Sequence, residues 1–110
     1  MTNATNNRLG IVLSTVTDSP PQEFVEIGQL AEANGYASVF VNEGRGDAIA
    51  CAQAIALGTE KIGTGTNIAN IYFRHPFLAA STTRTVAELS EGRFVLGLGM
   101  SHRSLLGSLG

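Results

Sequence analysis

The chain has 110 residues, of which 44% are hydrophobic and 15% are charged, and its formal net charge at pH 7 is −2. This is enough apolar material for one ordinary domain with a core, and it argues against wholesale disorder. Lysine and arginine total only seven and form no basic stripe, so nucleic acid is a poor partner. No apolar run approaches the ~20 residues of a transmembrane helix, so we expect no membrane association.

The first seven residues lack the basic end and the apolar stretch of a secretory signal. We therefore expect a flexible tail over residues 1–7, a domain over residues 8–110 and a cytoplasmic location. Cys51 is the single cysteine, which excludes an internal disulfide and any metal site with several cysteine ligands. Its alanine neighbours on a predicted helix indicate a buried and inert thiol.

The first predicted strand covers Arg8–Ser14, a nearly continuous apolar run typical of a strand that is buried on both faces. Ser19 as N-cap and Pro20 at the first helical position predict a helix that continues to about Asn34. The predicted apolar face of this helix consists of Phe24, Ile27, Leu30 and Ala31. Gly35 is predicted to end the helix in the left-handed conformation.

A second buried strand is predicted over Tyr36–Val41. The polar and flexible segment Asn42–Gly46 follows as its exit loop. Asp47 has the side chain of an N-cap, and it precedes a strongly apolar helix that is expected to stop at Gly58.

The third predicted strand lies within residues 61–68, where β-branched residues alternate with Gly63 and Gly65. Glycine inside a strand usually marks a place where another backbone or a flat ligand comes close. A polar turn is expected at Ala69–Asn70, and the third helix is expected over Pro76–Ser90. His75 directly precedes Pro76, and it is expected to cap this helix or to pack against neighbouring residues.

A fourth buried strand is predicted over Arg93–Gly99. The strand starts are spaced by roughly 24 to 32 residues, a normal length for a βα repeat. Four parallel strands and three helices fit two architectures, a small doubly wound sheet or part of a (βα)8 barrel. A complete barrel takes about 250 residues, so in the second case this chain holds less than half of one.

Several familiar sites are not supported. Two glycine-rich segments resemble the G-x-G-x-x-G dinucleotide fingerprint, but their sixth positions are Ile68 and His102. No phosphate-binding loop of the P-loop type and no G-x-S-x-G nucleophile motif is present. Glu43, His75 and His102 match no metal-ligand spacing, so we expect no metal site.

The polar exits of three predicted strands are the strongest functional signal. Asn42–Glu43, Asn67–Ile68 and Met100–His102 each follow the carboxyl end of a parallel strand. In either architecture these ends face the same side, which is where α/β proteins place their sites. Together with the glycine-containing strand, the three exits would form a shelf for a planar ring.

Three segments carry a family resemblance: GTGTNIANIYFRHP, VAELSEGR and RFVLGLG. Over residues 8–102 the chain resembles the bacterial luciferase-like monooxygenase family, which includes flavin-dependent monooxygenases and enzymes that depend on the deazaflavin F420. The resemblance implies the first half of a TIM-type (βα)8 barrel, incomplete in this chain, with the cofactor at its C-terminal face. It also implies a cis peptide between Asn67 and Ile68, and places the phosphate-binding groups beyond Gly110.

The resemblance further implies the N-terminal portion of an oxidoreductase that transfers a hydride between a small organic substrate and F420. The alternative cofactor is FMN, in a monooxygenase. The expected cofactor-binding residues are Asn67, Ile68, Gly99, Met100 and Ser101. The expected catalytic residues are His102 and Glu43, and histidine is the better candidate for proton transfer because it titrates near neutrality.

In some sugar-phosphate-oxidising members of the family, histidine and glutamate occupy the positions of Glu43 and His102, exchanged relative to this chain. The substrate therefore stays open. We expect a homo-oligomer, and we expect this portion alone to be inactive. The alternative hypothesis is a non-catalytic fragment or structural half-barrel that binds no flavin.

Overall fold

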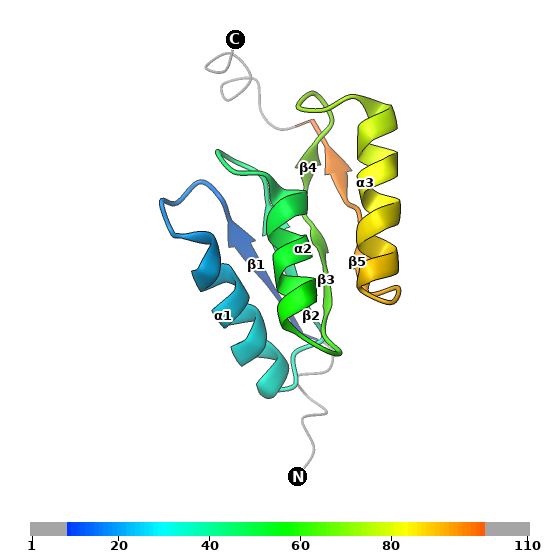
Figure 1. Ribbon diagram of the computed structural model, residues 1–110. Helices are drawn as coiled ribbons and strands as arrows, with labels where there is room; N and C mark the ends of the chain where they lie inside the picture. The colour runs from blue at the N-terminus through cyan, green and yellow to red at the C-terminus, as the bar shows by residue number, and fades with distance from the viewer. Residues whose placement is uncertain (1–8, 101–110) are drawn as a thin grey trace.

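The computed structural model describes residues 9–100, arranged as one layer of helices on one face of a parallel sheet (Figure 1). In chain order the elements are β1 (Gly10–Ser14), α1 (Pro21–Ala33), β2 (Ser38–Asn42), α2 (Ala48–Gly58), β3 (Gly63–Thr66), β4 (Ala69–Asn70), α3 (Pro76–Leu89), β5 (Phe94–Val95) and β6 (Leu98–Gly99). The main sheet has the strand order β1-β2-β3-β5, and β4 pairs separately with β6. All the pairings are parallel, as predicted. The expected tail over residues 1–7 lies outside the described residues.

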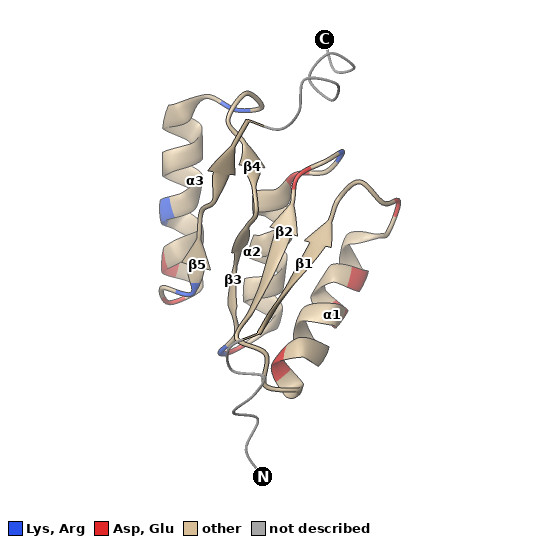
Figure 2. Ribbon diagram, turned by 180° about the vertical axis from the view of Figure 1, so that it is seen from behind, with Lys and Arg blue, Asp and Glu red and all other residues tan. Residues whose placement is uncertain are grey.

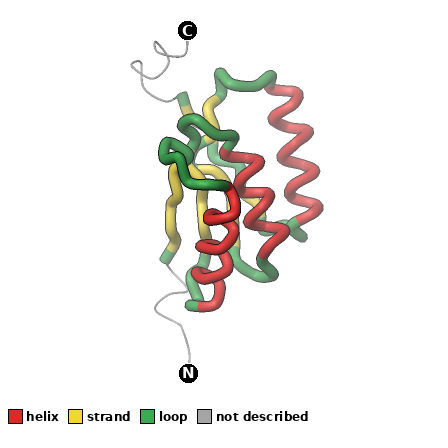
Figure 3. Tube along the Cα trace, turned by 60° about the vertical axis from the view of Figure 1, so that its left-hand side comes forward, coloured by secondary structure: helices red, strands yellow, loops and turns green. Residues whose placement is uncertain are grey.

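The core lies between the sheet and the three helices, which Figure 3 shows as two adjacent layers. Val39 and Val41 of β2 point into it and are fully buried. Ile49 and Ile55 of α2 meet them from the helical layer. α2 is apolar on most of its surface because it lies in the middle of that layer.

The opposite face of the sheet carries no helix among the described residues, as the view from behind shows (Figure 2). Val12, Phe40, Gly65 and Val95 form one row across this face through the strand register. Val12 is 54% exposed, so the prediction that the first strand is buried on both faces was wrong. The reason is that a parallel sheet is buried on both faces only when a second layer covers it.

The start of α1 differs from the prediction. Pro20, not Ser19, is the N-cap, and no side chain caps the helix. Leu30, expected on the buried face, is 64% exposed, whereas Gly28 is buried against Ile55. A Cβ on Gly28 would lie 2.7 Å from a side-chain methyl of Ile55, so glycine allows α1 and α2 to approach closely.

Other local predictions were confirmed. Asp47 caps α2 through its Oδ1 atom, which accepts hydrogen bonds from Ile49 N and Ala50 N at 3.0 and 3.1 Å. His75 caps α3, with Nδ1 accepting from Phe77 N at 3.0 Å. Gly35 follows α1 with φ of 81°, the expected left-handed conformation.

None of the helices within residues 9–100 has the length and hydropathy of a membrane-spanning segment.

Cys51 lies half-buried on α2 and packs against the core. Burial raises the pKa of its thiol, and the negative charges of Asp47 and Glu43 raise it further. The thiol is therefore a poor nucleophile near neutral pH, in line with the inert role expected from the sequence.

The end of the sheet corrects two further predictions. Ala69–Asn70 was expected to be a polar turn, but it forms the buried strand β4. The predicted fourth strand is broken into β5 and β6, because Thr66 interrupts the ladder at Gly97. The Thr66 hydroxyl accepts from Gly97 N at 3.0 Å and lies 2.8 Å from Gly97 O.

Candidate functional site at the carboxyl ends of the strands

The exit of β2 and the segment after β3 are held side by side. Asn67 N donates to Val41 O at 2.9 Å, and Glu43 N donates to Ile68 O at 3.2 Å. The side-chain amide of Asn42 donates to Asn67 O at 3.1 Å. The peptide between Asn67 and Ile68 is cis, as the resemblance implied. Two of the three predicted strand exits therefore meet at the same end of the sheet.

The third exit reaches the same place through β6. Ile71 N donates to Gly99 O at 2.9 Å, and a Cβ on Gly99 would lie 2.8 Å from the Ile68 side chain. Met100 follows and is 59% exposed. Ile68, Gly99 and Met100 thus lie close together at one end of the sheet. Ser101 and His102, predicted to complete this site, lie outside the described residues.

Gly65 does not belong to this surface. A Cβ on Gly65 would lie 2.1 Å from Val95 O, so its glycine admits the backbone of β5. Of the two explanations that the sequence left open, close approach of a backbone accounts for this position. Gly65 therefore leaves the strand exits as the candidate surface for a planar ring.

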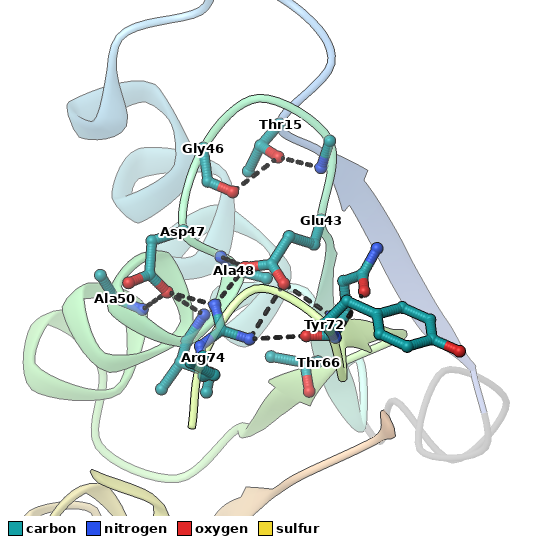
Figure 4. Close-up of polar contacts among 12 residues, drawn as sticks. Thr15, Glu43, Gly46, Asp47, Ala48, Ala50, Thr66, Tyr72 and Arg74 are labelled. Carbon is teal, nitrogen blue, oxygen red and sulfur yellow. Dashed lines mark hydrogen bonds and ion pairs between the residues drawn. The ribbon is translucent and has the colours of Figure 1, made fainter. Parts of the chain in front are cut away.

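Glu43 is buried, with 5% of the residue exposed. Its carboxylate is therefore shielded from solvent, although Glu43 lies in a loop. Its Oε1 accepts from Asn70 N at 2.6 Å and from Arg74 Nη1 at 3.0 Å. Its Oε2 accepts from Ala48 N at 2.9 Å and from Arg74 Nη2 at 2.5 Å (Figure 4). Both oxygens are therefore engaged by two donors each.

Arg74 lies at this end of the sheet and was not among the site residues expected from the sequence. Its side chain is only 11% exposed, and its guanidinium forms a two-pronged ion pair with Glu43. It also reaches Asp47 Oδ1 at 3.3 Å and Asn70 O at 3.4 Å. The hydrogen bond to Glu43 raises the pKa of Arg74 in spite of its burial, with a further contribution from the charges of Glu43 and Asp47. The signal in the sequence was a single cation inside the apolar and aromatic stretch IYFRHP.

Thr15 fastens the loop between β2 and α2 to the end of β1. Its hydroxyl accepts from Gly44 N at 2.6 Å and lies 3.1 Å from Asn42 O and 3.2 Å from Gly46 O. Gly44 is buried, and a Cβ there would lie 2.3 Å from a methyl of Val16. The loop after β2, which was expected to be flexible, is thus packed against Thr15 and Val16.

A planar cofactor is compatible with these residues. Asn67 is exposed and Ile68 is half-buried at the strand ends, which offers a polar edge beside an apolar surface. The side-chain Nδ2 of Asn70 is buried and has no hydrogen-bond partner among the described residues. A buried unpaired donor costs about 1–3 kcal/mol, so this amide is a candidate contact for a bound group or for residues outside the described range. Within residues 9–100, no group of three His, Cys, Asp or Glu side chains is placed to hold a metal ion.

Comparison with known proteins decides the family. Residues 5–105 match the family model described as luciferase-like monooxygenase. The chain belongs to the luciferase-like monooxygenase family. Its parallel βα units match part of a TIM-type barrel, which confirms the fold class expected from the sequence.

Relatives within the luciferase-like family include reductases. A 5,10-methylenetetrahydromethanopterin reductase from Methanolobus tindarius is 28% identical over 97 residues, which cover 86% of this chain and 30% of the relative. The solved structure of the coenzyme F420-dependent tetrahydromethanopterin reductase from Methanopyrus kandleri superposes with a TM-score of 0.84 at 27% identity, covering 93% of this chain and 29% of that chain. This luciferase-like chain thus spans about 30% of the length of these relatives.

A further solved structure shares the fold. It is the oxygenating constituent of 3,6-diketocamphane monooxygenase from Pseudomonas putida, solved in complex with FMN. The TM-score is 0.79 at 17% identity, and the match covers 94% of this chain and 32% of that chain. At this identity the likeness concerns the fold alone.

Proposed function

We propose that this chain forms the first part of an F420-dependent oxidoreductase, which transfers a hydride between a small organic substrate and the deazaflavin. The observation that carries the proposal is the meeting of Asn67–Ile68, Gly99 and Met100 at the carboxyl ends of parallel strands. It is supported by the 27% identity to an F420-dependent reductase structure. FMN is the alternative cofactor, since a neighbour with the same fold was solved with FMN.

In this proposal the cofactor supplies the redox chemistry, and the protein supplies shape, orientation and electrostatics. Ile68, Gly99 and Met100 provide the surface for the planar ring, and Asn67 offers polar contacts at its edge. Ser101 is proposed to bind the cofactor, and His102 to transfer a proton to or from the substrate. The cytoplasmic location and the homo-oligomeric state belong to the same proposal.

A binding titration tests the proposal. The protein at its full natural length is titrated separately with F420 and with FMN, and ring fluorescence is followed. We expect saturable binding, tighter for F420 than for FMN. Tighter binding of FMN would transfer the proposal to the monooxygenase branch. Binding of neither would favour the alternative, a structural module without a flavin.

Two variants locate the bound ring. Asn67→Leu places a bulky apolar side chain at the strand exit, so we expect weaker cofactor binding with little change in the free energy of unfolding. Thr85→Leu, at an exposed position on α3, is the matched control and should bind like the wild type. Equal affinities in all three proteins would remove Asn67 from the proposed site.

A further inference from the structure

The Glu43–Arg74 ion pair joins two segments that are 31 residues apart in the sequence. The side chain of Glu43 is 1% exposed and that of Arg74 is 11% exposed, so both charges are largely shielded from solvent. Burying two charges costs free energy that their attraction does not always repay, and apolar replacements of such pairs are often equally stable. Stability alone is therefore a weak explanation for this pair.

The pair holds the main chain of Asn70 from both sides. Asn70 N donates to Glu43 Oε1 at 2.6 Å, and Asn70 O accepts from Arg74 Nη1 at 3.4 Å. The main-chain nitrogen of Glu43 also donates to Ile68 O. One residue, Glu43, thus fixes the segment from Ile68 to Asn70 through its backbone at one end and its carboxylate at the other.

The same carboxylate connects this segment to α2. Ala48 N, in the first turn of α2, donates to Glu43 Oε2 at 2.9 Å, while Arg74 also contacts the capping residue Asp47 (Figure 4). Four N–H groups of the protein donate hydrogen bonds to the Glu43 carboxylate, two to each oxygen. This arrangement suits holding other groups in place better than exchanging protons with a substrate.

We propose that Glu43 and Arg74 are positioning residues, whose ion pair holds Asn67–Asn70 so that Ile68 and Gly99 present the cofactor surface. The inference rests on the proposed function, and it replaces the catalytic role that the sequence suggested for Glu43. Asn42 and Thr15 support the same arrangement, through the bond from Asn42 Nδ2 to Asn67 O and the contacts of the Thr15 hydroxyl with the β2–α2 loop.

The test uses Glu43→Gln, which keeps the shape but loses the charge, and Arg74→Lys, which keeps the charge but loses the two-pronged geometry. In the protein at its full natural length, we expect at least a tenfold loss of cofactor affinity for each, with turnover at saturating cofactor within a few-fold of the wild type. In the cofactor-free protein, we expect faster hydrogen exchange at the Asn70 amide, measured by NMR.

Glu32→Gln is the matched control. Glu32 is also a carboxylate that accepts main-chain N–H groups, but its donors Glu60, Lys61 and Ile62 precede β3, at the opposite end of the strands. This variant should change stability while leaving cofactor affinity and Asn70 exchange as in the wild type. An apolar double variant, Glu43→Met with Arg74→Leu, covers the case in which a single variant fails to fold. This double variant should fold, and it should bind the cofactor less tightly than the wild type.

Three outcomes separate the possibilities. Wild-type affinity and wild-type Asn70 exchange in the folded Glu43 and Arg74 variants would overturn the positioning role. Unchanged affinity with turnover lowered a hundredfold or more at saturating cofactor would overturn it in favour of a catalytic Glu43. If the wild type binds neither F420 nor FMN, the proposed function fails. The Asn70 exchange rates then decide alone whether the ion pair positions the segment.

Discussion

The carboxylate of Glu32, in the last turn of α1, accepts a hydrogen bond from the main-chain nitrogen of Lys61 at 2.5 Å. Glu60 N and Ile62 N donate to the same oxygen, each at 2.9 Å. Burial acts to raise the pKa of Glu32, but the three backbone hydrogen bonds and the charge of Arg93 outweigh it and hold that pKa below its usual value. One side chain thereby anchors the turn that leads into β3.

Glu32 predicts a pH dependence of stability. Because its pKa is lower in the folded than in the unfolded protein, the unfolded state binds more protons in acid. Its contribution is complete above the ordinary carboxyl pKa of about 4.3 and is lost as the pH falls through the lower folded value. Glu32→Gln should therefore lower the free energy of unfolding at neutral pH and flatten its decline in acid. Urea unfolding of both proteins at a series of pH values measures this difference, and the exposed Glu88→Gln is the control. Parallel pH profiles of stability for the wild type and Glu32→Gln would contradict the prediction.

Gly65 and Gly63 predict unequal responses to the same substitution. A Cβ at Gly65 would meet Val95 O at 2.1 Å, whereas one at Gly63 would meet Ala37 O at 3.2 Å. Since the main chain of β5 cannot rotate away, Gly65→Ala should cost about 1–3 kcal/mol or more through overpacking. Gly63→Ala should cost clearly less. Thermal and urea unfolding of both variants measure the difference, and equal losses would show that β5 yields at this point.

The uncovered face of the sheet predicts self-association of residues 1–110 expressed alone. Val12 and Val95 are 54% and 56% exposed there, and β1 and β5 are the edges of the main sheet. Apolar faces and unpaired strand edges favour pairing with other chains. We expect dimers, aggregates or a molten state in sedimentation experiments, and less association for Val12→Lys with Val95→Lys. The control Leu57→Lys, on the equally exposed surface of α2, should associate like the wild type. A monomer with sharp cooperative melting would contradict the prediction.

His102 predicts an effect on turnover. If it transfers a proton, His102→Ala should lower turnover by roughly 10²–10⁴-fold in the protein at its full natural length, with little change in cofactor affinity. The second histidine provides the control, because His75 caps α3 through Nδ1 and His75→Ala should affect stability more than turnover. Steady-state kinetics with a cofactor titration separate the two effects. Nearly full turnover in His102→Ala would make this histidine a bystander.

The sequence by itself determined the alternation of strands and helices along the chain and the ends of several helices. Asp47, His75 and Gly35 act through contacts or dihedral angles within one turn of the chain, so residue type and position predict them. The parallel arrangement followed from the βα repeat, and the meeting of the strand exits followed in turn from that arrangement. The family resemblance located the cis peptide between Asn67 and Ile68.

Only the tertiary structure decided which residues hold the site together. Arg74 and Glu43 meet across 31 residues, and that contact depends on strand register and loop path, which local preferences do not specify. The last strand is divided into β5 and β6 where the Thr66 hydroxyl hydrogen-bonds to Gly97. Gly65 has no room for a side chain because the backbone of β5 lies close to it. The exposure of Val12 likewise depends on the absence of a second layer over that face, within the part of the chain described. Periodicity reports that a strand is apolar, whereas burial depends on what the rest of the molecule places against it.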